Sequence, residues 1–462
     1  MTSTLSARAT AGVRRDLGRL VALDRVITEP AALFGYSYDS TTVLRGTSPL
    51  AVVQPAETSQ VAAVLRYANA HDLPIIPRGS GTGLSGGCVP LGHELVLDLS
   101  RINRLRAVET TRRRAIAEPG VLTGDLLAAV EPAGLFYPPD PSSLKVSSLG
   151  GNVAENAGGP RGLKYGVTQD YVQALEVVLI DGEVLDLRRE EDWDALALFV
   201  GSEGTLGAIT LVEVRLIPMP PARRALLAVF PQLEAATRTV SIILREGITP
   251  SLIELMDDIA IRCVESYRGL GLPLDVEAIL LIETDGDKSE ANRDAARVRD
   301  LCEAAGAREV RIAATAEEAE ALWTARRSIT GALGRVRPDK IGEDICVPRP
   351  AIPAMARRVK EIGREFGVPV VLFGHAGDGN LHPNVLFSSL DADERQRGEA
   401  AADAIIAAAT ELGGVISGEH GVGIMKRKFM SLNVDSATMG LMRTFKQAVD
   451  PKGLLNPGKL LT

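Results

Sequence analysis

The chain has 462 residues, of which 45% are apolar and 24% charged, with a formal net charge of −8. This length predicts two or three domains, and the composition is that of a globular protein with large cores. An acidic chain with interspersed charges argues against nucleic-acid binding, and no apolar run approaches the ~20 residues of a membrane span. The 4 cysteines are scattered, which is typical of a reducing compartment. We therefore expect a cytoplasmic protein, attached to the inner membrane at most peripherally.

The first half of the chain predicts short helices and strands in alternation. An amphipathic helix with Val13, Leu17 and Leu20 on one face opens the chain. Further helices are predicted at residues 58–71 and 123–130, and strands at residues 51–53, 73–77, 95–99 and 174–180. A proline-rich segment at residues 217–221 ends this half and predicts a domain boundary there.

The second half has the same α+β character. Strands are predicted at residues 225–230, 278–283 and 370–375, and helices at residues 232–246, 289–305 and 315–327. This alternation predicts a sheet with helices over one face. The last 60 or so residues are predicted to be mostly helical, and they end in a turn-rich tail.

Two glycine-rich segments, residues 374–384 and 417–423, contain three of the 5 histidines. His375 and His382 flank an Asp-Gly turn signal, after which a strand is predicted to resume at residues 385–387, so we expect both at the mouth of a hairpin. Two imidazoles with the Glu419 carboxylate form a ligand set for a divalent metal with an open position, which leaves His420 as an acid/base. Because the spacing matches no standard zinc motif, histidines that only bind backbone carbonyls are the alternative.

Three further glycine-rich loops lie in the first half, at residues 77–87, 150–159 and 201–207. The first contains G-x-G-x-x-G from Gly81 to Gly86, but Gly87 and Pro90 lead on to a strand where a dinucleotide fingerprint requires a helix. The backbone N–H groups of a non-helical glycine loop can still bind a pyrophosphate. Three such loops in one domain predict a long cofactor that lies across them.

On these loops, the two histidine segments and the tail motif at residues 456–459, the chain resembles the FAD-dependent D-2-hydroxyacid dehydrogenases of the vanillyl-alcohol-oxidase superfamily. It is most similar to glycolate oxidase flavoprotein subunits and D-lactate dehydrogenases. The resemblance implies an α+β fold with a PCMH-type FAD-binding domain of two α+β subdomains at residues 1–221. It also implies a substrate-binding cap domain with an antiparallel sheet at residues 222–410. A C-terminal helical segment, residues 411–462, would return to the FAD domain.

The resemblance also implies roles for individual residues. FAD would be bound non-covalently, since residues 77–90 contain no histidine. Its binding residues would be Arg78, Gly79, Ser80, Gly81, Thr82, Gly83, Gly86, Gly87, Pro139, Asp140, Ser143, Gly150, Asn152, Gly158, Gly159, Glu203, Gly204, Ile209 and Asn456. A divalent metal, zinc or a similar first-row ion, would be bound by His375, His382 and Glu419, with His420 as general base. The substrate would be bound by Arg326, which clamps its carboxylate, and by Thr330, Asn384 and Lys340.

The function implied is oxidation of a D-2-hydroxy acid of the glycolate or D-lactate type to the 2-oxo acid. The metal would acidify the hydroxyl, His420 would take its proton, and hydride would pass to flavin N5. The spacing around Lys340 departs from the family pattern, which counts against D-2-hydroxyglutarate. A quinone, a cytochrome or a partner redox subunit would accept the electrons, in a homodimer or a hetero-oligomer. The alternatives are a non-catalytic or assembly flavoprotein subunit and a metal-dependent hydrolase, although a hydrolase leaves the glycine loops unexplained.

Overall fold

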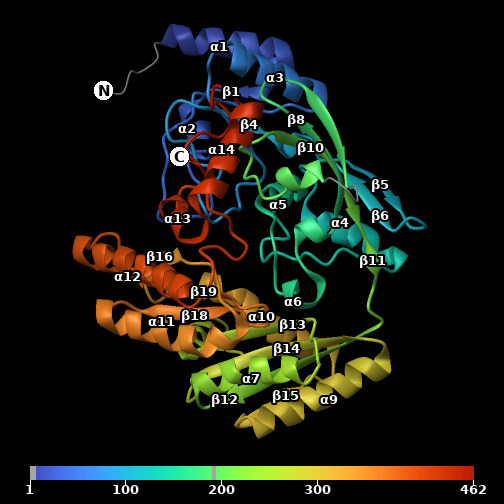
Figure 1. Ribbon diagram of the computed structural model, residues 1–462, viewed down its shortest axis with the longest axis vertical. Coiled ribbons are helices and arrows are strands. Elements are labelled where there is room, and N and C mark those ends of the chain that lie inside the picture. The colour runs from blue at the N-terminus through green and yellow to red at the C-terminus, as the bar shows by residue number, and fades with distance from the viewer. Residues whose placement is uncertain (1–6, 190–193, 462) are drawn as a thin grey trace. The chain divides into compact units, whose positions relative to one another are not determined.

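Figure 1 shows the computed structural model of the chain, which describes residues 7–189 and 194–461. The chain forms two compact units. Residues 1–157, 167–218 and 420–462 make up the first unit, and residues 158–166 and 219–419 the second. The domain boundaries expected from the sequence lie at residues 221/222 and 410/411. In the structure, the chain passes from the first unit to the second at residues 218/219 and returns at residues 419/420. None of the helices in the described ranges is long and apolar enough to cross a membrane.

The first unit contains a four-stranded sheet in the order β1-β2-β4-β3 (Val26–Ile27, Ala51–Val53, Leu95–Asp98 and Ile75–Arg78). The last three strands are parallel, because the helix α3 (Thr58–Ala70) connects β2 to β3 as a crossover. The helices α1 (Ala7–Val21) and α3 contribute Leu17, Val61 and Leu65 to the core over this sheet. The short helix α2 (Pro30–Phe34) lies between β1 and β2 in the chain.

A second, antiparallel sheet of the first unit has the order β5-β6-β10-β8-β9 (Leu105–Glu109, Arg114–Ala117, Ala208–Arg215, Val172–Val178 and Val184–Arg188). The helices α4 (Thr123–Val130) and α5 (Leu149–Glu155) bury Leu126, Val130 and Val153 in its core. The strands β7 (Leu135–Phe136) and β11 (Ile217–Pro218) pair separately. The last helices are α13 (Met430–Asn433) and α14 (Ser436–Val449). The expectation of a mostly helical C-terminus is wrong over residues 412–426, which are glycine-rich and form no α-helix.

The second unit is built on one antiparallel sheet in the order β15-β12-β14-β13-β18-β19-β16, with β17 also paired to β19. Its strands are β12 (Ala222–Phe230), β13 (Leu252–Asp257), β14 (Ala278–Gly286), β15 (Glu309–Ile312), β16 (Asp339–Gly342), β17 (Ile345–Cys346), β18 (Val370–His375) and β19 (Asn380–Phe387). Its helices are α6 (Gly162–Tyr165), α7 (Leu233–Arg245), α8 (Asp258–Arg268), α9 (Lys288–Ala304), α10 (Ala316–Leu333), α11 (Ile352–Phe366) and α12 (Ala392–Glu411). The predicted antiparallel sheet of the cap is thus confirmed.

Helices cover both faces of this sheet, so the expectation of helices on one face is wrong. Leu227 and Leu281 pack into a core with α8 and α10. On the other face, the hydroxyl of Thr284 donates to the carbonyl of Ala291 in α9, at 2.9 Å. The signal for two covered faces was in the sequence, because β12 and β14 are continuous apolar runs without the alternation of a half-exposed strand.

The strands β18 and β19 form the hairpin expected around residues 375–382, with His375 opposite Asn380. The second strand begins at Asn380, five residues earlier than the sequence predicted, and it includes Pro383. The carbonyl of Pro383 accepts the N–H of Glu343, so the ring nitrogen of the proline faces the same neighbour. On that side β19 is paired with β16 and with β17, and the two strands leave a gap opposite Pro383. The proline is tolerated because no backbone hydrogen bond of the sheet is lost at this position.

Candidate active site

The first glycine loop leaves the sheet at Arg78, the last residue of β3, and the buried guanidinium of this residue shapes the loop. It donates to the carbonyl of Tyr38 at 2.9 Å and lies 5.3 Å from the centre of the Tyr36 ring. Gly81 has a left-handed φ of 69°, and a Cβ there would lie 2.2 Å from Nη2 of Arg78. The glycine is therefore required both by the turn and by the arginine packed against it.

The first and third glycine loops meet the C-terminal tail at Asn456. Its side-chain amide donates to the carbonyls of Gly87, at 2.9 Å, and of Glu203, at 2.7 Å. The Glu203 carboxylate in turn accepts the backbone N–H groups of Val422 and Gly423, both at 2.7 Å. Three segments that are far apart in sequence, all predicted to approach one cofactor, are thus brought together within the first unit.

Several buried polar atoms around these loops have no hydrogen-bond partner among the residues that the structure describes. They are Oγ of Ser85, Oγ of Ser148, Oε2 of Glu155 and Oδ1 of Asn456. Buried polar groups are normally satisfied, so this cluster fits a polar ligand with many donors and acceptors. A Cβ on Gly79 would lie 2.3 Å from Oγ of Ser148, so the loop also passes close to the start of α5. The residues present therefore fit a bound FAD.

The other predicted cofactor residues occupy different surroundings. Asn152, in α5, donates its amide to Oγ1 of Thr123 at 2.6 Å, and a Cβ on Gly150 would lie 2.4 Å from Cβ of Pro119. Packing alone thus explains both residues. The loop that follows β7 contains Pro139, Asp140 and Ser143, and the first glycine loop contains Ser80, Thr82 and Gly83. Gly204 lies in the third glycine loop and Ile209 in β10. Gly158 and Gly159 belong to the short segment, residues 158–166, that is part of the second unit.

In the second unit, the predicted metal ligands converge. The rings of His375 and His382 lie edge to face with their centres 4.9 Å apart. Nε2 of His375 is 3.2 Å from Oε1 of Glu419, and Nε2 of His382 is 3.4 Å from the same oxygen. Ligand atoms of a tetrahedral site with bonds of about 2.0–2.1 Å are separated by about 3.3 Å. The two separations between an imidazole nitrogen and the carboxylate oxygen therefore fit a first-row divalent ion.

Asp344, which the sequence analysis did not assign to the site, fixes the segment that carries Glu419. Its fully buried carboxylate accepts the hydroxyl of Ser417 at 2.8 Å and the N–H groups of Gly418 and Glu419 at 2.9 and 3.0 Å. An oxygen of Asp344 also lies within 4.8 Å of ligand atoms of His382 and Glu419. His420 follows Glu419 directly, where the chain returns to the first unit.

A second buried acid, Glu254 of β13, also escaped the sequence analysis. It lies directly opposite His375 in the sheet register, with Oε1 2.5 Å from Nδ1 of that ring. Its other oxygen accepts Nε of Arg326, from α10, whose guanidinium carbon lies 4.9 Å from the Phe373 ring. The available signal was a single acid in the apolar run of residues 252–256, because a charge at the centre of a buried strand requires a partner.

The electrostatics of this group follow from its burial. Burial acts to raise the pKa of Glu254, but the charges of Arg326 and His375 outweigh it and hold the pKa at about 2. For His375, burial acts to lower the pKa, whereas Glu254 and Glu419 together hold it well above its usual value. The two carboxylates thus favour a protonated His375 in the metal-free protein, and a divalent cation would displace the proton on the nitrogen that faces Glu419.

The remaining predicted substrate residues lie on this part of the cap. Asn384 shares a face of β19 with His382 and donates its amide to the carbonyl of His382 at 3.0 Å. Lys340 of β16 pairs with Leu386 in register and so shares that face, and burial lowers its pKa. Thr330 follows Arg326 by one turn of α10 and is exposed.

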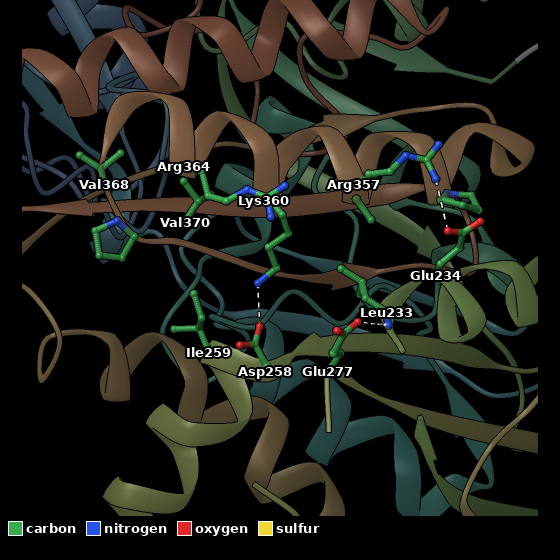
Figure 2. Close-up of a pocket in the computed structure, with 14 residues that line it drawn as sticks. Leu233, Glu234, Asp258, Ile259, Glu277, Arg357, Lys360, Arg364, Val368 and Val370 are labelled. Atoms are coloured by element: carbon green, nitrogen blue, oxygen red, sulfur yellow. Dashed lines mark hydrogen bonds and ion pairs between the residues drawn. The ribbon is translucent and has the colours of Figure 1, made fainter. Parts of the chain in front are cut away.

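A separate cavity of about 530 Å³ lies beside α7 and α11 (Figure 2). Figure 2 shows Lys360 pointing to Asp258, at 2.8 Å, and Arg357 lies 3.4 Å from Glu234. Lys360 also donates to Asp257, at 2.5 Å. These cations and acids already compensate one another, and none of the predicted site residues lines the cavity. It is therefore not the candidate active site.

Comparison with known proteins agrees with both halves of this description. The family profile "FAD linked oxidases, C-terminal domain" matches residues 219–460, and "FAD binding domain" matches residues 49–188. The glycolate oxidase subunit GlcD of Bacillus subtilis is 43% identical over 430 residues, which cover 92% of this chain and 91% of the relative. The D-lactate dehydrogenase of Anaerostipes hadrus is 33% identical and covers 95% of each chain.

Solved structures show the same fold at low identity. A p-cresol methylhydroxylase structure superposes with a TM-score of 0.84 at 16% identity, and covers 100% of this chain and 98% of the other. The 4-ethylphenol oxidase of Gulosibacter chungangensis superposes with a TM-score of 0.82 at 20% identity, with the same coverage. The predicted α+β flavoprotein fold is confirmed.

Proposed function

We propose, because the chain belongs to the family of FAD-linked oxidases, that it oxidises a small D-2-hydroxy acid to the 2-oxo acid. The names of its relatives, glycolate oxidase subunits and D-lactate dehydrogenases, support this substrate class. The observation that carries the proposal is the convergence of His375, His382 and Glu419 in the same cap as the buried Arg326, in a chain with an FAD-binding domain.

A divalent ion, zinc or a similar first-row metal, would be held by His375, His382 and Glu419. Such an ion, when bound, lowers the pKa of a coordinated hydroxyl, and bound FAD supplies the hydride acceptor. Neutral nitrogen and carboxylate oxygen together suit several first-row metals, so the donor set favours this class of ion over calcium or magnesium.

The side chains of the cap and the following segment would do the rest. Glu254 occupies Nε of Arg326, so the two terminal nitrogens of the guanidinium can grip the substrate carboxylate in a bidentate pair. His420, next to a metal ligand in the chain, would accept the hydroxyl proton. Asn384, Lys340 and Thr330 would line the acid's side-chain end, where the half-buried Lys340 is the cation available to a second carboxylate.

Relatives from Bacillus subtilis and Escherichia coli are named as subunits of glycolate oxidase, which supports transfer of the electrons to another redox component. We place this chain in a hetero-oligomer whose partner redox subunit, or a quinone or cytochrome, reoxidises the enzyme.

The test is anaerobic reduction of the bound flavin, followed by its absorbance, with glycolate, D-lactate, L-lactate and D-2-hydroxyglutarate. We expect rapid bleaching by glycolate or D-lactate, slower bleaching by the other two acids, and loss of bleaching after a chelator, restored by zinc. Pyruvate, which carries no hydrogen on C2 that could leave as hydride, is the matched control. A yellow protein that no acid bleaches would instead be a non-catalytic flavoprotein subunit.

A further inference from the structure

Glu254 hydrogen-bonds to both halves of the proposed site, the metal ligand His375 and the carboxylate clamp Arg326. Its two carboxylate oxygens are divided between them, since Oε1 lies 2.5 Å from Nδ1 of His375 and Oε2 accepts Nε of Arg326. The residue is fully buried, and the register of β13 and β18 places it directly opposite His375. Its position is therefore fixed by the backbone of the sheet.

Each contact has a chemical consequence. A carboxylate that accepts the Nδ1 hydrogen holds the imidazole in the tautomer whose lone pair is on Nε2, the nitrogen that faces Glu419. A carboxylate on Nε of an arginine fixes the plane of the guanidinium and leaves its terminal nitrogens facing away. The Phe373 ring, 4.9 Å from the guanidinium carbon, further restricts that plane.

We propose that Glu254 is a positioning residue that sets the metal ligand His375 and the carboxylate clamp Arg326 at one fixed spacing. This inference rests on the proposed function for the substrate half, whereas its metal half stands on the ligand geometry alone.

The chain offers a matched control three residues away. Asp257 ends the same strand and is equally buried, and it also binds a cation, Lys360 at 2.5 Å. That cation comes from α11, which contributes nothing to the proposed site. The Asp257 carboxylate also accepts the N–H groups of Ala260 and of Leu372 in β18, both at 2.8 Å. Asp257→Asn therefore changes a buried acid of β13 that hydrogen-bonds neither His375 nor Arg326.

The experiment measures zinc affinity by competition with a chromophoric chelator, and the KM and kcat of flavin reduction by D-lactate or glycolate, on the FAD-loaded protein. For Glu254→Gln we expect zinc affinity to fall by about 10–100-fold, the usual effect of losing the carboxylate behind a ligating histidine. We also expect KM to rise by about 10-fold or more, because the guanidinium loses its fixed plane. For Arg326→Gln only KM should rise, and Asp257→Asn should match the wild type in both.

If Glu254→Gln does not fold, Glu254→Asp supplies the same comparison, since a carboxylate one methylene shorter cannot reach both partners. Wild-type zinc affinity and wild-type KM in a folded Glu254 variant would overturn this inference alone. An equal loss of zinc affinity in Asp257→Asn would also overturn it, because the effect would then come from any buried charge on β13. A wild-type protein that binds no divalent ion and is bleached by no acid overturns the proposed function with it.

Discussion

At the scale of single residues, the proposed chemistry depends most on His420. It directly follows Glu419 in the chain, and Glu419 is a proposed ligand of the metal to which the substrate hydroxyl would bind. A positioned general base contributes about 10²–10⁴-fold to a rate. In His420→Ala we therefore expect flavin reduction to slow by at least about 100-fold, while FAD and zinc stay bound.

Stopped-flow absorbance under anaerobic conditions measures this rate, and elemental analysis checks the metal. His71→Ala is the control, because this histidine is exposed at the end of α3 and has no proposed role in the reaction. Reduction of His420→Ala at the wild-type rate would contradict its assignment as the base.

At the scale of elements, the first glycine loop depends on Gly81. The residue has a φ of 69°, and an added Cβ would lie 2.2 Å from the Arg78 guanidinium that anchors the loop to the carbonyl of Tyr38. A non-glycine residue in this conformation costs about 1–3 kcal/mol, and the displaced arginine adds to that. For Gly81→Ala we expect a lower melting temperature and weaker FAD binding, measured by thermal denaturation and by flavin fluorescence.

Gly440→Ala is the matched control for this loop. Gly440 lies within α14 with open space around it, so an added methyl group meets nothing within 4 Å. Alanine in a helix is favoured over glycine by about 0.5–1 kcal/mol, and this variant should be slightly more stable than the wild type. If both variants have the same melting temperature and FAD affinity, the positive φ of Gly81 does not determine the stability of the loop or its FAD binding.

Sequence patterns predicted the elements well where the determining interactions are local. The helix predicted at residues 123–130 is α4 (Thr123–Val130), and the strand predicted at residues 51–53 is β2 (Ala51–Val53). The Asp-Gly turn likewise placed His375 near His382, because only six residues separate them. The second strand of that hairpin was predicted too short, since the break opposite Pro383 depends on β16 and β17.

At the scale of the whole molecule, long-range pairing is what the sequence did not reveal. Glu254 and His375 are 121 positions apart and become partners only because β13 and β18 are neighbours in the sheet. Asp344 binds a segment 73 to 75 residues away in the same manner. The donor types of the candidate site could be predicted from two short motifs, whereas the pairing of Glu254 with His375 depends on the strand order.

Glu155, which lies beside the buried Glu203, links the folding of the first unit to pH. Burial, with the nearby charges of Glu203 and Asp39, raises the pKa of Glu155 well above that of an ordinary carboxyl group. Glu155 and Glu203 flank Gly421, where an added Cβ would lie 2.5 Å from an oxygen of one and 3.0 Å from an oxygen of the other. The folded protein therefore holds the Glu155 proton at pH values where the unfolded chain has released it.

The sign of the effect follows from linkage. As pH rises above the ordinary carboxyl value, the unfolded state gains stability from releasing this proton, so the free energy of unfolding falls until the raised pKa is passed. Glu155→Gln cannot ionise, and we expect it to be more stable than the wild type at pH 8, with a smaller gap at pH 5. Thermal denaturation of the FAD-saturated proteins across this range measures the gap.

Glu203→Gln provides the contrast, because Glu203 accepts two backbone N–H groups, at 2.7 Å each, and an amide oxygen replaces only one of its two acceptors. A buried N–H left without a partner costs about 1–3 kcal/mol, so this variant should lose stability at every pH. A Glu155→Gln variant whose stability gap to the wild type does not change between pH 5 and pH 8 would show that Glu155 is ionised in the folded protein. The N–H groups of Val422 and Gly423 would then stabilise the charge of Glu203 strongly enough for a second carboxylate to be ionised beside it.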